Sequence, residues 1–551
     1  EAATVGGGGY NTASSYATVG GGYDNSAGTY ATVGGGGYNT ASSYGAVGGG
    51  YDNSAGTYAT VGGGYGNTAS GSSATVSGGT NNTASVDYVT VSGGRNNTAS
   101  NYYATVSGGR DNTASGEAAT VGGGRDNTAS GYAATVSGGQ DNSGSGEIAT
   151  VGGGFDNTAS GYVATVGGGN YNTASSYYAT VGGGAVNTAS GGWATVGGGT
   201  YNTASGEYAT AGGGFDNTAR GNYSTAMGSG TTASNLASTA MGANTIARGD
   251  YATAMGQNSD ASGSRATAMG DSTASGSYSL SAGYHPVASG NYSVALGNEA
   301  IASGEASLAV GDNTVASGNF SVALGFEATA NGIASLSVGD NTVSGGIGSV
   351  ALGYGPAANA NYSCALGSRS VANHSGAFVW GDSTAGTVVS PAANSVTMRA
   401  AGGYRLYSNA ATNAGVSLLA GGTSWAVISD RNVKKDFAPV DAVAVLEKLA
   451  GMPITQWHYN WETSETTPHI GPMAQDFKAA FYPGSDDKSI TTLEADGVAF
   501  AAIQGLNEKL EVRGQNSEVR IQKLETENVE LKARLEKLEQ LLTHKLNGGV
   551  K

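Results

Sequence analysis

The stretch Ala119-Thr120-Val121-Gly122-Gly123-Gly124-Arg125-Asp126-Asn127-Thr128-Ala129-Ser130-Gly131 represents most of the chain, because close copies of it recur from the first residues onward. Its valine returns every 14 residues from Val5 to Val61 and every 15 residues from Val76 to Val196. Helical repeats need about 33 residues or more, whereas a period near 14 suits one coil of a β-solenoid. The sequence therefore predicts a mainly β chain built around a parallel β-solenoid with 14–15-residue coils.

Each coil is expected to contain two short strands joined by glycine corners. Within Tyr16-Ala17-Thr18-Val19, alternation places Ala17 and Val19 on one face of the first strand. A second strand fits Asn-Thr-Ala-Ser, and its Asn, which recurs from Asn11 to Asn217, would stack into a side-chain ladder. Glycines suit corners that need positive φ or close backbone approach. We expect only Ala, Val, Leu and Met to face inward, which makes a thin core.

From about residue 223 the unit changes to Ser-Val-Ala-Leu-Gly-x-x-Ala-x-Ala-x-Gly, as at Ser293-Val294-Ala295-Leu296-Gly297 and Ser321-Val322-Ala323-Leu324-Gly325. This pattern resembles the head repeat of YadA-type trimeric adhesins, closely over residues 223–381 and more loosely over the Gly-rich repeats 1–222. The resemblance implies a left-handed parallel β-roll packed as a homotrimer. A lone rod would expose rows of apolar and Tyr side chains, so association is also expected on physical grounds.

Composition excludes several classes of function. The 551 residues include 96 Gly, only 12% charged residues and a net charge of −16, without a basic patch, so nucleic acid is not an expected partner. One cysteine, Cys364, rules out a disulfide framework and a cysteine-built zinc site. No run approaches the ~18 apolar residues of a membrane span. We expect no metal, no cofactor and no membrane insertion. The chain starts at Glu1 without an initiator Met, so we expect an N-terminal anchoring region that this sequence lacks.

The outward positions of the solenoid leave four interpretations open. The array can be a rigid spacer, or an adhesive surface that binds through exposed tyrosines. Ice binding by a ladder of threonines is a weaker interpretation, because each strand carries only one outward Thr. Calcium binding by a row of aspartates is also weaker, because the calcium-binding β-roll has a different, nine-residue period. No pair of carboxylates suits glycan cleavage. The side chains in question are Tyr10, Tyr23, Tyr38 and Tyr51; Thr18, Thr32, Thr60 and Thr75; and Asp24, Asp52, Asp111 and Asp126.

After Gly381 the 14-residue period stops, and residues 382–428 are expected to form a small β neck or connector. Short strand-like pieces follow there, such as Ser395–Ala400 and Gly403–Tyr407, separated by Gly and Asn turns. The segment resembles the one that precedes the C-terminal domain of phage and bacterial tail-fibre proteins.

At Ile428 the composition shifts abruptly towards charged residues, which marks a domain boundary. Residues 429–505 include Ser-Asp-Arg-Asn-Val-Lys-Lys-Asp-Phe from Ser429 and His-Ile-Gly-Pro-Met-Ala-Gln-Asp-Phe from His469. These motifs resemble the peptidase S74 domain, the intramolecular chaperone of endosialidase and other phage tail fibres. The resemblance implies that the domain assembles the upstream trimer and then cuts itself off between Ile428 and Ser429, with Ser429 and Lys434 as the catalytic residues.

The chemistry of this pair is coherent on its own. A Ser hydroxyl needs a base, and a Lys serves when its surroundings favour the neutral amine; Ser-Lys pairs are a known variant of the Ser-His-Asp arrangement. The alternative is that Ser429 and Asp430 cap a turn or helix start and Lys434 is a surface charge. His469 could orient the pair, but a structural hydrogen bond suits it better.

The C-terminal residues 506–551 carry the spacing of a coiled coil, alternating steps of three and four. Asn528 at a core position leans towards a dimer, whereas the twice-repeated Arg-apolar-x-x-apolar-Glu pattern resembles a trimer-favouring motif. The alternative is an amphipathic helix packed on its own domain. The core positions are Ile521, Leu524, Asn528, Leu531, Leu535, Leu538 and Leu542.

Together these features predict a homotrimeric fibre, of tail-fibre or appendage type, that attaches to a cell-surface glycan or protein receptor. Its place would be extracellular, or on the surface of a virion or injection particle. The alternative is a bacterial surface adhesin of the trimeric YadA-like type, in which residues 429–551 stay attached as a permanent trimerising cap. Apart from one self-cleavage, no catalysis is expected.

Overall fold

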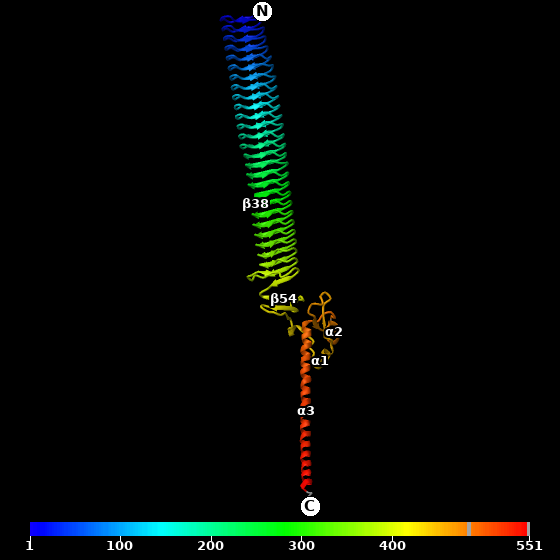
Figure 1. The fold of residues 1–551 in the computed structure, drawn as a ribbon. Coiled ribbons are helices and arrows are strands. Elements are labelled where there is room, and N and C mark those ends of the chain that lie inside the picture. The colour runs from blue at the N-terminus through cyan, green and yellow to red at the C-terminus, as the bar shows by residue number, and fades with distance from the viewer. Residues whose placement is uncertain (482–485, 548–551) are drawn as a thin grey trace. The chain divides into compact units, whose positions relative to one another are not determined.

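The computed structural model describes residues 1–481 and 486–547, which divide into two units, Glu1–Arg399 and Ala400–Lys551. Residues 482–485 and 548–551, which end or interrupt the expected chaperone-like and coiled-coil ranges, lie outside the described residues. The first unit is a parallel β-solenoid of about 28 turns with coils of about 14 residues (Figure 1). The predicted fold class, a mainly β chain built around a parallel β-solenoid, is thereby confirmed.

Three parallel ladders run along the solenoid. In the first, β1 (Thr4–Val5) pairs with β3 (Thr18–Val19); in the second, β2 (Thr12–Ala13) pairs with β4 (Ser26–Ala27). This alternation of two-residue strands continues to β28 (Thr203–Ala204). The third ladder consists of single bridges at the Gly-rich corner, from Gly9 and Tyr23 onward. Every turn therefore hydrogen-bonds to the next along three ladders, which give each short strand a neighbour on both sides.

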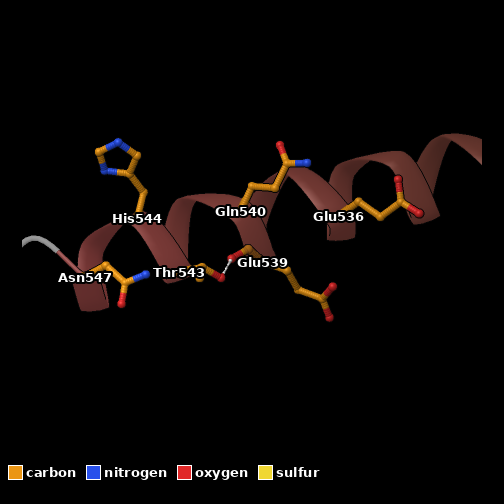
Figure 2. A pocket seen from close by; sticks show the side chains of 6 residues that line it. All are labelled: Glu536, Glu539, Gln540, Thr543, His544 and Asn547. Carbon is orange, nitrogen blue, oxygen red and sulfur yellow. Dashed lines mark hydrogen bonds between the residues drawn. The ribbon is translucent and has the colours of Figure 1, made fainter.

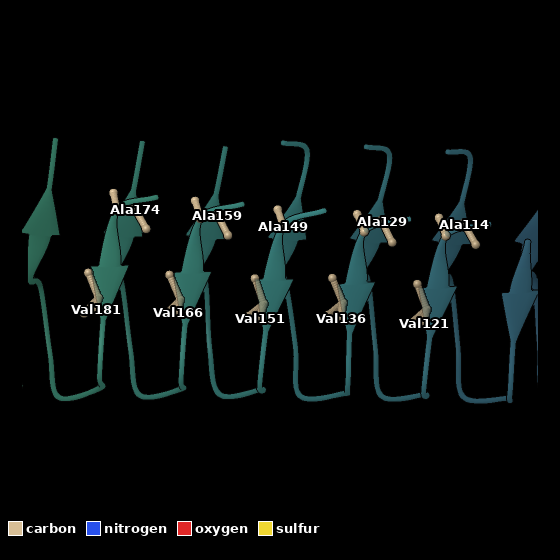
Figure 3. Packing of buried hydrophobic residues seen from close by; sticks show 14 of the residues in the cluster. Ala114, Val121, Ala129, Val136, Ala149, Val151, Ala159, Val166, Ala174 and Val181 are labelled. Carbon is tan, nitrogen blue, oxygen red and sulfur yellow. The ribbon is translucent and has the colours of Figure 1, made fainter. Parts of the chain in front are cut away.

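The core is a thin double column of small side chains. In one turn Ala119, Val121 and Ala129 are each 0% exposed, and the same positions in the next turns continue the Ala and Val rows (Figure 3). The alternation of side chains along a strand explains which residues face inward, because Thr120 and Thr128 alternate with these residues and point outward. The space between the two strands admits nothing larger than valine in these turns.

A buried asparagine ladder replaces apolar packing beside the glycine corner. Asn127 is 0% exposed and its Nδ2 donates to the carbonyls of Gly123 and Gly139, both at 2.9 Å. Its Oδ1 accepts the backbone N–H of Asn142 at 3.0 Å. Gly124 turns the corner at φ +90°, where a Cβ would lie 2.1 Å from the oxygen of Gly139, so only glycine fits. The predicted ladder is therefore present, and it gives the Gly123 carbonyl a donor and the Asn142 N–H an acceptor.

Replacing Asn127 by Ala is expected to lower the free energy of unfolding by about 2–4 kcal/mol, because it removes the hydrogen-bond partners of the Gly123 carbonyl and of the buried backbone N–H of Asn142. The adjacent Thr128→Ala, on the outward side of the strand, is the matched control and is expected to cost under about 1 kcal/mol. Unfolding in guanidinium, followed by tyrosine fluorescence, measures both. Equal unfolding midpoints for the two variants would contradict a structural role of the ladder.

The coil shortens from 15 to 14 residues at β29 (Thr210–Phe215), where the pairing with β31 (Thr225–Ser229) shifts between Ala211 and Gly213. Beyond this irregularity the corner straightens, and most first-ladder strands are five residues long, up to β49 (Cys364–Ser368). The two longest are β37 (Thr267–Ala274) and β38 (Leu280–Ala288), each of which covers two ladders in one strand.

The prediction that Leu and Met line the core is wrong. In β39 (Val294–Asn298), Ala295 is buried, while Val294 and Leu296 are half-buried on the outward face. Met227 is 39% exposed. The buried Ser293 starts the inward alternation, and this places every second residue, Val and Leu, outside. The repeats 223–381 thus carry an outward apolar row that the Thr and Gly of earlier turns lack.

The parallel ladder continues beyond Gly381, where the sequence period stops. β53 (Val396–Arg399) pairs in register with β51 (Phe378–Gly381), one turn of 18 residues later. The extra residues form a corner loop that Arg399 braces, with its Nε 2.9 Å from an Asp382 oxygen and its Nη2 donating to the carbonyl of Thr384 at 2.6 Å. The expected connector therefore begins within the last solenoid turn.

The second unit combines small sheets and helices. β54 (Gly403–Tyr407), β55 (Gly415–Leu419) and β56 (Ala426–Val427) form an antiparallel sheet. A 3-10 turn, η1 (Arg431–Val433), leads to α1 (Ala442–Gly451), whose start is capped by Asp441.

The rest of this unit packs around one small apolar cluster. The remaining elements are β57 (Thr455–Trp457), paired with β58 (His469–Gly471), then α2 (Ala474–Phe481) and α3 (Thr492–Asn547). Met452, Phe477 and Val498 form the cluster that joins α1, α2 and α3.

The 56-residue helix α3 packs on its own unit only near its start. Gly505 lies against α1, where a Cβ would be 2.1 Å from the carbonyl oxygen of Ala442, and Lys509 pairs with Glu447 at 2.9 Å. From Leu506 to Asn547 every residue is exposed, including Leu531 (61%) and Leu538 (57%). The alternative of a helix packed along its own domain is therefore wrong for the heptad region. Among the described helices, none is both long and apolar enough to cross a membrane.

Candidate functional site

The Ile428–Ser429 bond lies directly after the last strand of the β54–β56 sheet. Val427 pairs with Val416, and the backbone N–H of Ile428 donates to the carbonyl of Gly415 at 3.1 Å. These hydrogen bonds fix the acyl side of the bond, whereas Ser429 begins the turn that follows. A change of direction at this point exposes the bond rather than enclosing it in the sheet.

The turn brings the two predicted site residues together. Asp430 caps η1, its carboxylate accepting the backbone N–H of Asn432 at 2.9 Å, and the N–H of Lys434 donates to the carbonyl of Arg431 at 3.2 Å. The chain thereby folds back, and Lys434 Nζ lies 2.6 Å from Ser429 Oγ as its hydrogen-bond donor. Of the two residues considered as caps, only Asp430 caps the turn, since the Ser429 hydroxyl is hydrogen-bonded to Lys434.

Both members of this pair are exposed in the single chain. An open depression beside them is lined by Asn413, Val427, Ile428, Asn432, Val433 and Lys434, among others. Arg431 packs its guanidinium 5.2 Å from the ring of Phe437, which closes the far side of the turn. The arrangement can align a hydroxyl with a lysine amine next to a peptide carbonyl, which is the minimum needed for an acyl shift.

His469 has a structural partner. Its Nε2 lies 3.0 Å from Glu462 Oε1, and its ring stacks on Trp457 at a centroid distance of 4.7 Å. The hydrogen bond from His469, followed by the backbone N–H of Tyr459, lowers the pKa of Glu462 from its ordinary value of 4.5. The structural hydrogen bond expected of this histidine is thus present, on the hairpin of β57 and β58.

This lowered pKa makes the hairpin sensitive to acid. A carboxylate with a lowered pKa contributes stability above its ordinary value of 4.5, and the contribution is lost as the pH falls through the lowered pKa. We expect Glu462→Gln to remove this acid dependence, whereas Glu465→Gln in the same loop keeps it. Tryptophan fluorescence during an acid titration measures the transition. The same acid midpoint in the parent and in Glu462→Gln would contradict the assignment.

A second depression, on α3, is open as well. This depression, near the end of α3, is lined by Glu536, Glu539, Gln540, Thr543, His544 and Asn547, all from one bare helix with nothing opposite them (Figure 2). Within residues 1–481 and 486–547, no group of three or more His, Cys, Asp or Glu side chains could hold a metal ion. Of the aspartates considered for calcium, Asp111 and Asp126 pair with the adjacent Arg110 and Arg125 at 3.1 and 3.3 Å.

The aromatic side chains form columns that the sequence analysis only partly recognised. Tyr10, Tyr23, Tyr38 and Tyr51, the tyrosines considered for adhesion, pack edge to face at 5.1–5.7 Å, so part of each ring is covered. A second column stacks Tyr16 on Tyr30 at 4.9 Å, and similar stacks recur along later turns. The 14-residue spacing of Tyr16, Tyr30, Tyr44 and Tyr58 was the available signal.

Comparison with known protein families now agrees with both resemblances. The family described as the chaperone of endosialidase, peptidase S74, matches residues 429–484. The YadA head domain repeat matches five consecutive segments, residues 219–245, 247–273, 274–300, 302–328 and 330–355. No curated protein sequence matches the chain. The chain is therefore similar to two kinds of surface fibre. One similarity lies in the solenoid, which we call the shaft, and the other in the chaperone-like domain.

Proposed function

We propose that the protein is a homotrimeric fibre that attaches to a cell surface and is assembled by its C-terminal domain, which then releases itself between Ile428 and Ser429. The family matches support the coarser statement, a tail-fibre or adhesin-like protein of an extracellular or surface-exposed type. The observation that carries the finer proposal is the 2.6 Å contact between Lys434 Nζ and Ser429 Oγ, directly after the β54–β56 sheet.

Trimerisation is supported by apolar surface at two places. The outward row of the YadA-like repeats places Val294 and Leu296 above Leu308 and Val310, turn after turn, with no covering element among the described residues. On α3 the heptad leucines are exposed over several turns. Apolar rows of this length are costly in water, and burying them between copies of the chain is favourable.

Release follows from the neighbouring groups. With Lys434 as a neutral amine accepting its proton, Ser429 Oγ attacks the Ile428 carbonyl carbon. The C–N bond of the peptide then breaks, and the lysine returns the proton to the departing Ser429 nitrogen. The resulting ester is hydrolysed by water, which leaves a carboxylate on Ile428 and restores the Ser429 hydroxyl. A single turnover completes the reaction.

Association supplies the condition that this chemistry needs. Both side chains are exposed to water in the single chain. Packing of three second units around the turn would desolvate the pair, favouring the neutral amine that can act as a base. Cleavage would then follow assembly rather than precede it.

The YadA-like repeats favour a second candidate, a bacterial surface adhesin in which residues 429–551 remain attached as a permanent trimerising cap. Both candidates share the shaft and the trimer. They differ in whether the Ile428–Ser429 bond persists in the mature particle, and in whether the shaft alone or the whole chain faces the cell.

Native mass spectrometry of the full chain, together with binding of labelled protein to bacterial cells, tests the fibre role. We expect three copies per particle and saturable binding to cells, competed by unlabelled protein. Replacing Leu531 and Leu538, which are 61% and 57% exposed in the single chain, by Asp is expected to replace the three-copy particle by aggregates or a spread of masses, because the shaft rows then associate without a fixed register. Particles of one chain from the parent protein, or a parent that binds no cell, would count against the proposal.

A further inference from the structure

One corner of the solenoid presents a side chain from every turn on a left-handed backbone. Between residues 251 and 320 these corner residues have φ values of 51–59°, and we call them the corner column. Tyr278 and Tyr292 stack there at 5.1 Å with an angle of 12° between rings. The column contains Tyr251, Arg265, Tyr278, Tyr292, Ala306 and Phe320.

Arg265 shows what this column holds between two rings. Its Cζ lies 5.2 Å from the ring centroid of Tyr251 on one side and 5.1 Å from that of Tyr278 on the other. Its Nη1 donates to Tyr278 Oη at 2.6 Å. Two aromatic rings separated by two turns thus accommodate a planar guanidinium, at distances where cation–π attraction is effective.

Ala306 leaves the equivalent position open. It lies between Tyr292 and Phe320, which are two turns apart, roughly 10 Å at the ~4.8 Å spacing of neighbouring strands. A methyl group cannot fill that separation. Tyr292 and Phe320 are 58% and 59% exposed, whereas Tyr278, which has neighbours on both faces, is 47% exposed. The larger exposed fractions are expected from the alanine neighbours, Ala306 beside Tyr292 and both Ala306 and Ala334 beside Phe320.

Glu305 places a negative charge beside the open position. Its side chain is exposed, and its backbone carbonyl accepts the N–H of Phe320 at 2.7 Å, so it belongs to the same corner. A comparable interruption at Ala237, between Tyr223 and Tyr251, has Leu236 in place of this glutamate, and its neighbouring turns carry both Arg220 and Asp250. A carboxylate in the same turn as the alanine therefore distinguishes Ala306 from Ala237.

We propose that the opening at Ala306 binds the guanidinium group of an arginine side chain on a partner protein. The planar cation would lie between the rings of Tyr292 and Phe320, as Arg265 lies between Tyr251 and Tyr278. The Glu305 carboxylate and Tyr292 Oη accept its hydrogen bonds, as Tyr278 Oη does for Arg265. This site requires neither cleavage nor any particular role of the second unit.

The test uses the full chain flowed over an immobilised Gly-Arg-Gly peptide, with Gly-Lys-Gly as the comparison surface. We expect preferential retention on the arginine surface and loss of that retention in Ala306→Arg, whose own guanidinium fills the opening. Phe320→Ala is expected to weaken binding about two- to fivefold, the contribution of one partly exposed cation–π contact. Ala133→Arg is the matched control, since Ala133 has the same φ of 51° but lies between Ala118 and Ile148.

Arg265→Ala provides a gain-of-binding arm, because it opens a second position between tyrosine rings and is expected to increase retention. Equal retention of the parent and Ala306→Arg would overturn the proposal, as would the absence of retention by the parent. Displacement of the parent by methyl glycosides, with equal retention on the arginine and lysine surfaces, would identify the rings as a sugar-stacking surface instead and also overturn it.

Discussion

Freshly expressed parent protein is expected to separate into fragments 1–428 and 429–551, whereas Ser429→Ala is expected to remain intact. Alanine has no hydroxyl to attack the Ile428 carbonyl, so the acyl shift has no nucleophile. Removing a catalytic nucleophile costs several orders of magnitude in rate, which is complete loss on the time scale of expression. Intact-mass measurement detects both fragments and locates the cut to a single bond.

Lysine variants separate the base from a charge effect. Lys434→Ala is expected to slow cleavage about 10²–10⁴-fold, the usual contribution of a positioned base. Lys435→Ala, one residue further on, removes the same charge without the 2.6 Å contact to Ser429 and is the matched control. An intact parent chain would leave residues 429–551 as a permanent cap. Cleavage of Ser429→Ala at the same bond would assign the reaction to another nucleophile.

Much of the shaft could be predicted because its repeat period can be counted directly from the sequence. The valine and asparagine spacings defined the coil, its two strands and the buried ladder, since stacking converts a fixed period into aligned side chains. The direction of the Leu296 side chain, inward or outward, could not be predicted in the same way. In Ser-Val-Ala-Leu-Gly either alternate pair can point inward, and only the thin interior, which suits Ser293 and Ala295, decides between them.

The end of the shaft was misplaced for a related reason. The turn from Phe378 to Val396 is four residues longer than its neighbours, and an insertion in a corner loop does not interrupt the ladder. Its signal, Arg399 reaching back to Asp382, is a long-range contact without a sequence motif. Stacking of Arg265 between Tyr251 and Tyr278 has the same character, because rings that are two turns apart become neighbours only once the coil is closed.

At the site, the family resemblance named Ser429 and Lys434, and the local turn explains how a spacing of five residues becomes a contact. Asp430 caps η1 and reverses the chain, so the lysine returns to the serine without help from a distant element. Desolvation of the pair lies beyond both the sequence and the single chain, because the groups that would exclude water belong to other copies.

Deleting residues 429–551 is expected to give shafts that are insoluble or heterogeneous in length and register. Successive turns are nearly identical, so three solenoids offset by one or two turns bury almost the same rows of Val, Leu and Ile as aligned ones. The energetic difference is confined to the ends, while the non-local contacts of a parallel sheet form slowly and leave strand edges open to mispairing. A domain that fixes the three chains at one end removes the offset states before the shaft closes.

The informative comparison is between the 1–428 truncation and full-length Ser429→Ala, which keeps the domain attached. We expect uniform, heat-resistant trimers from Ser429→Ala and aggregates or a spread of masses from the truncation, measured by light scattering after size separation. Supplying fragment 429–551 as a separate chain is not expected to rescue the truncation, since alignment requires a covalent link to each shaft during folding. Soluble, uniform trimers from residues 1–428 alone would show that the shaft sets its own register, and the chaperone role would fail.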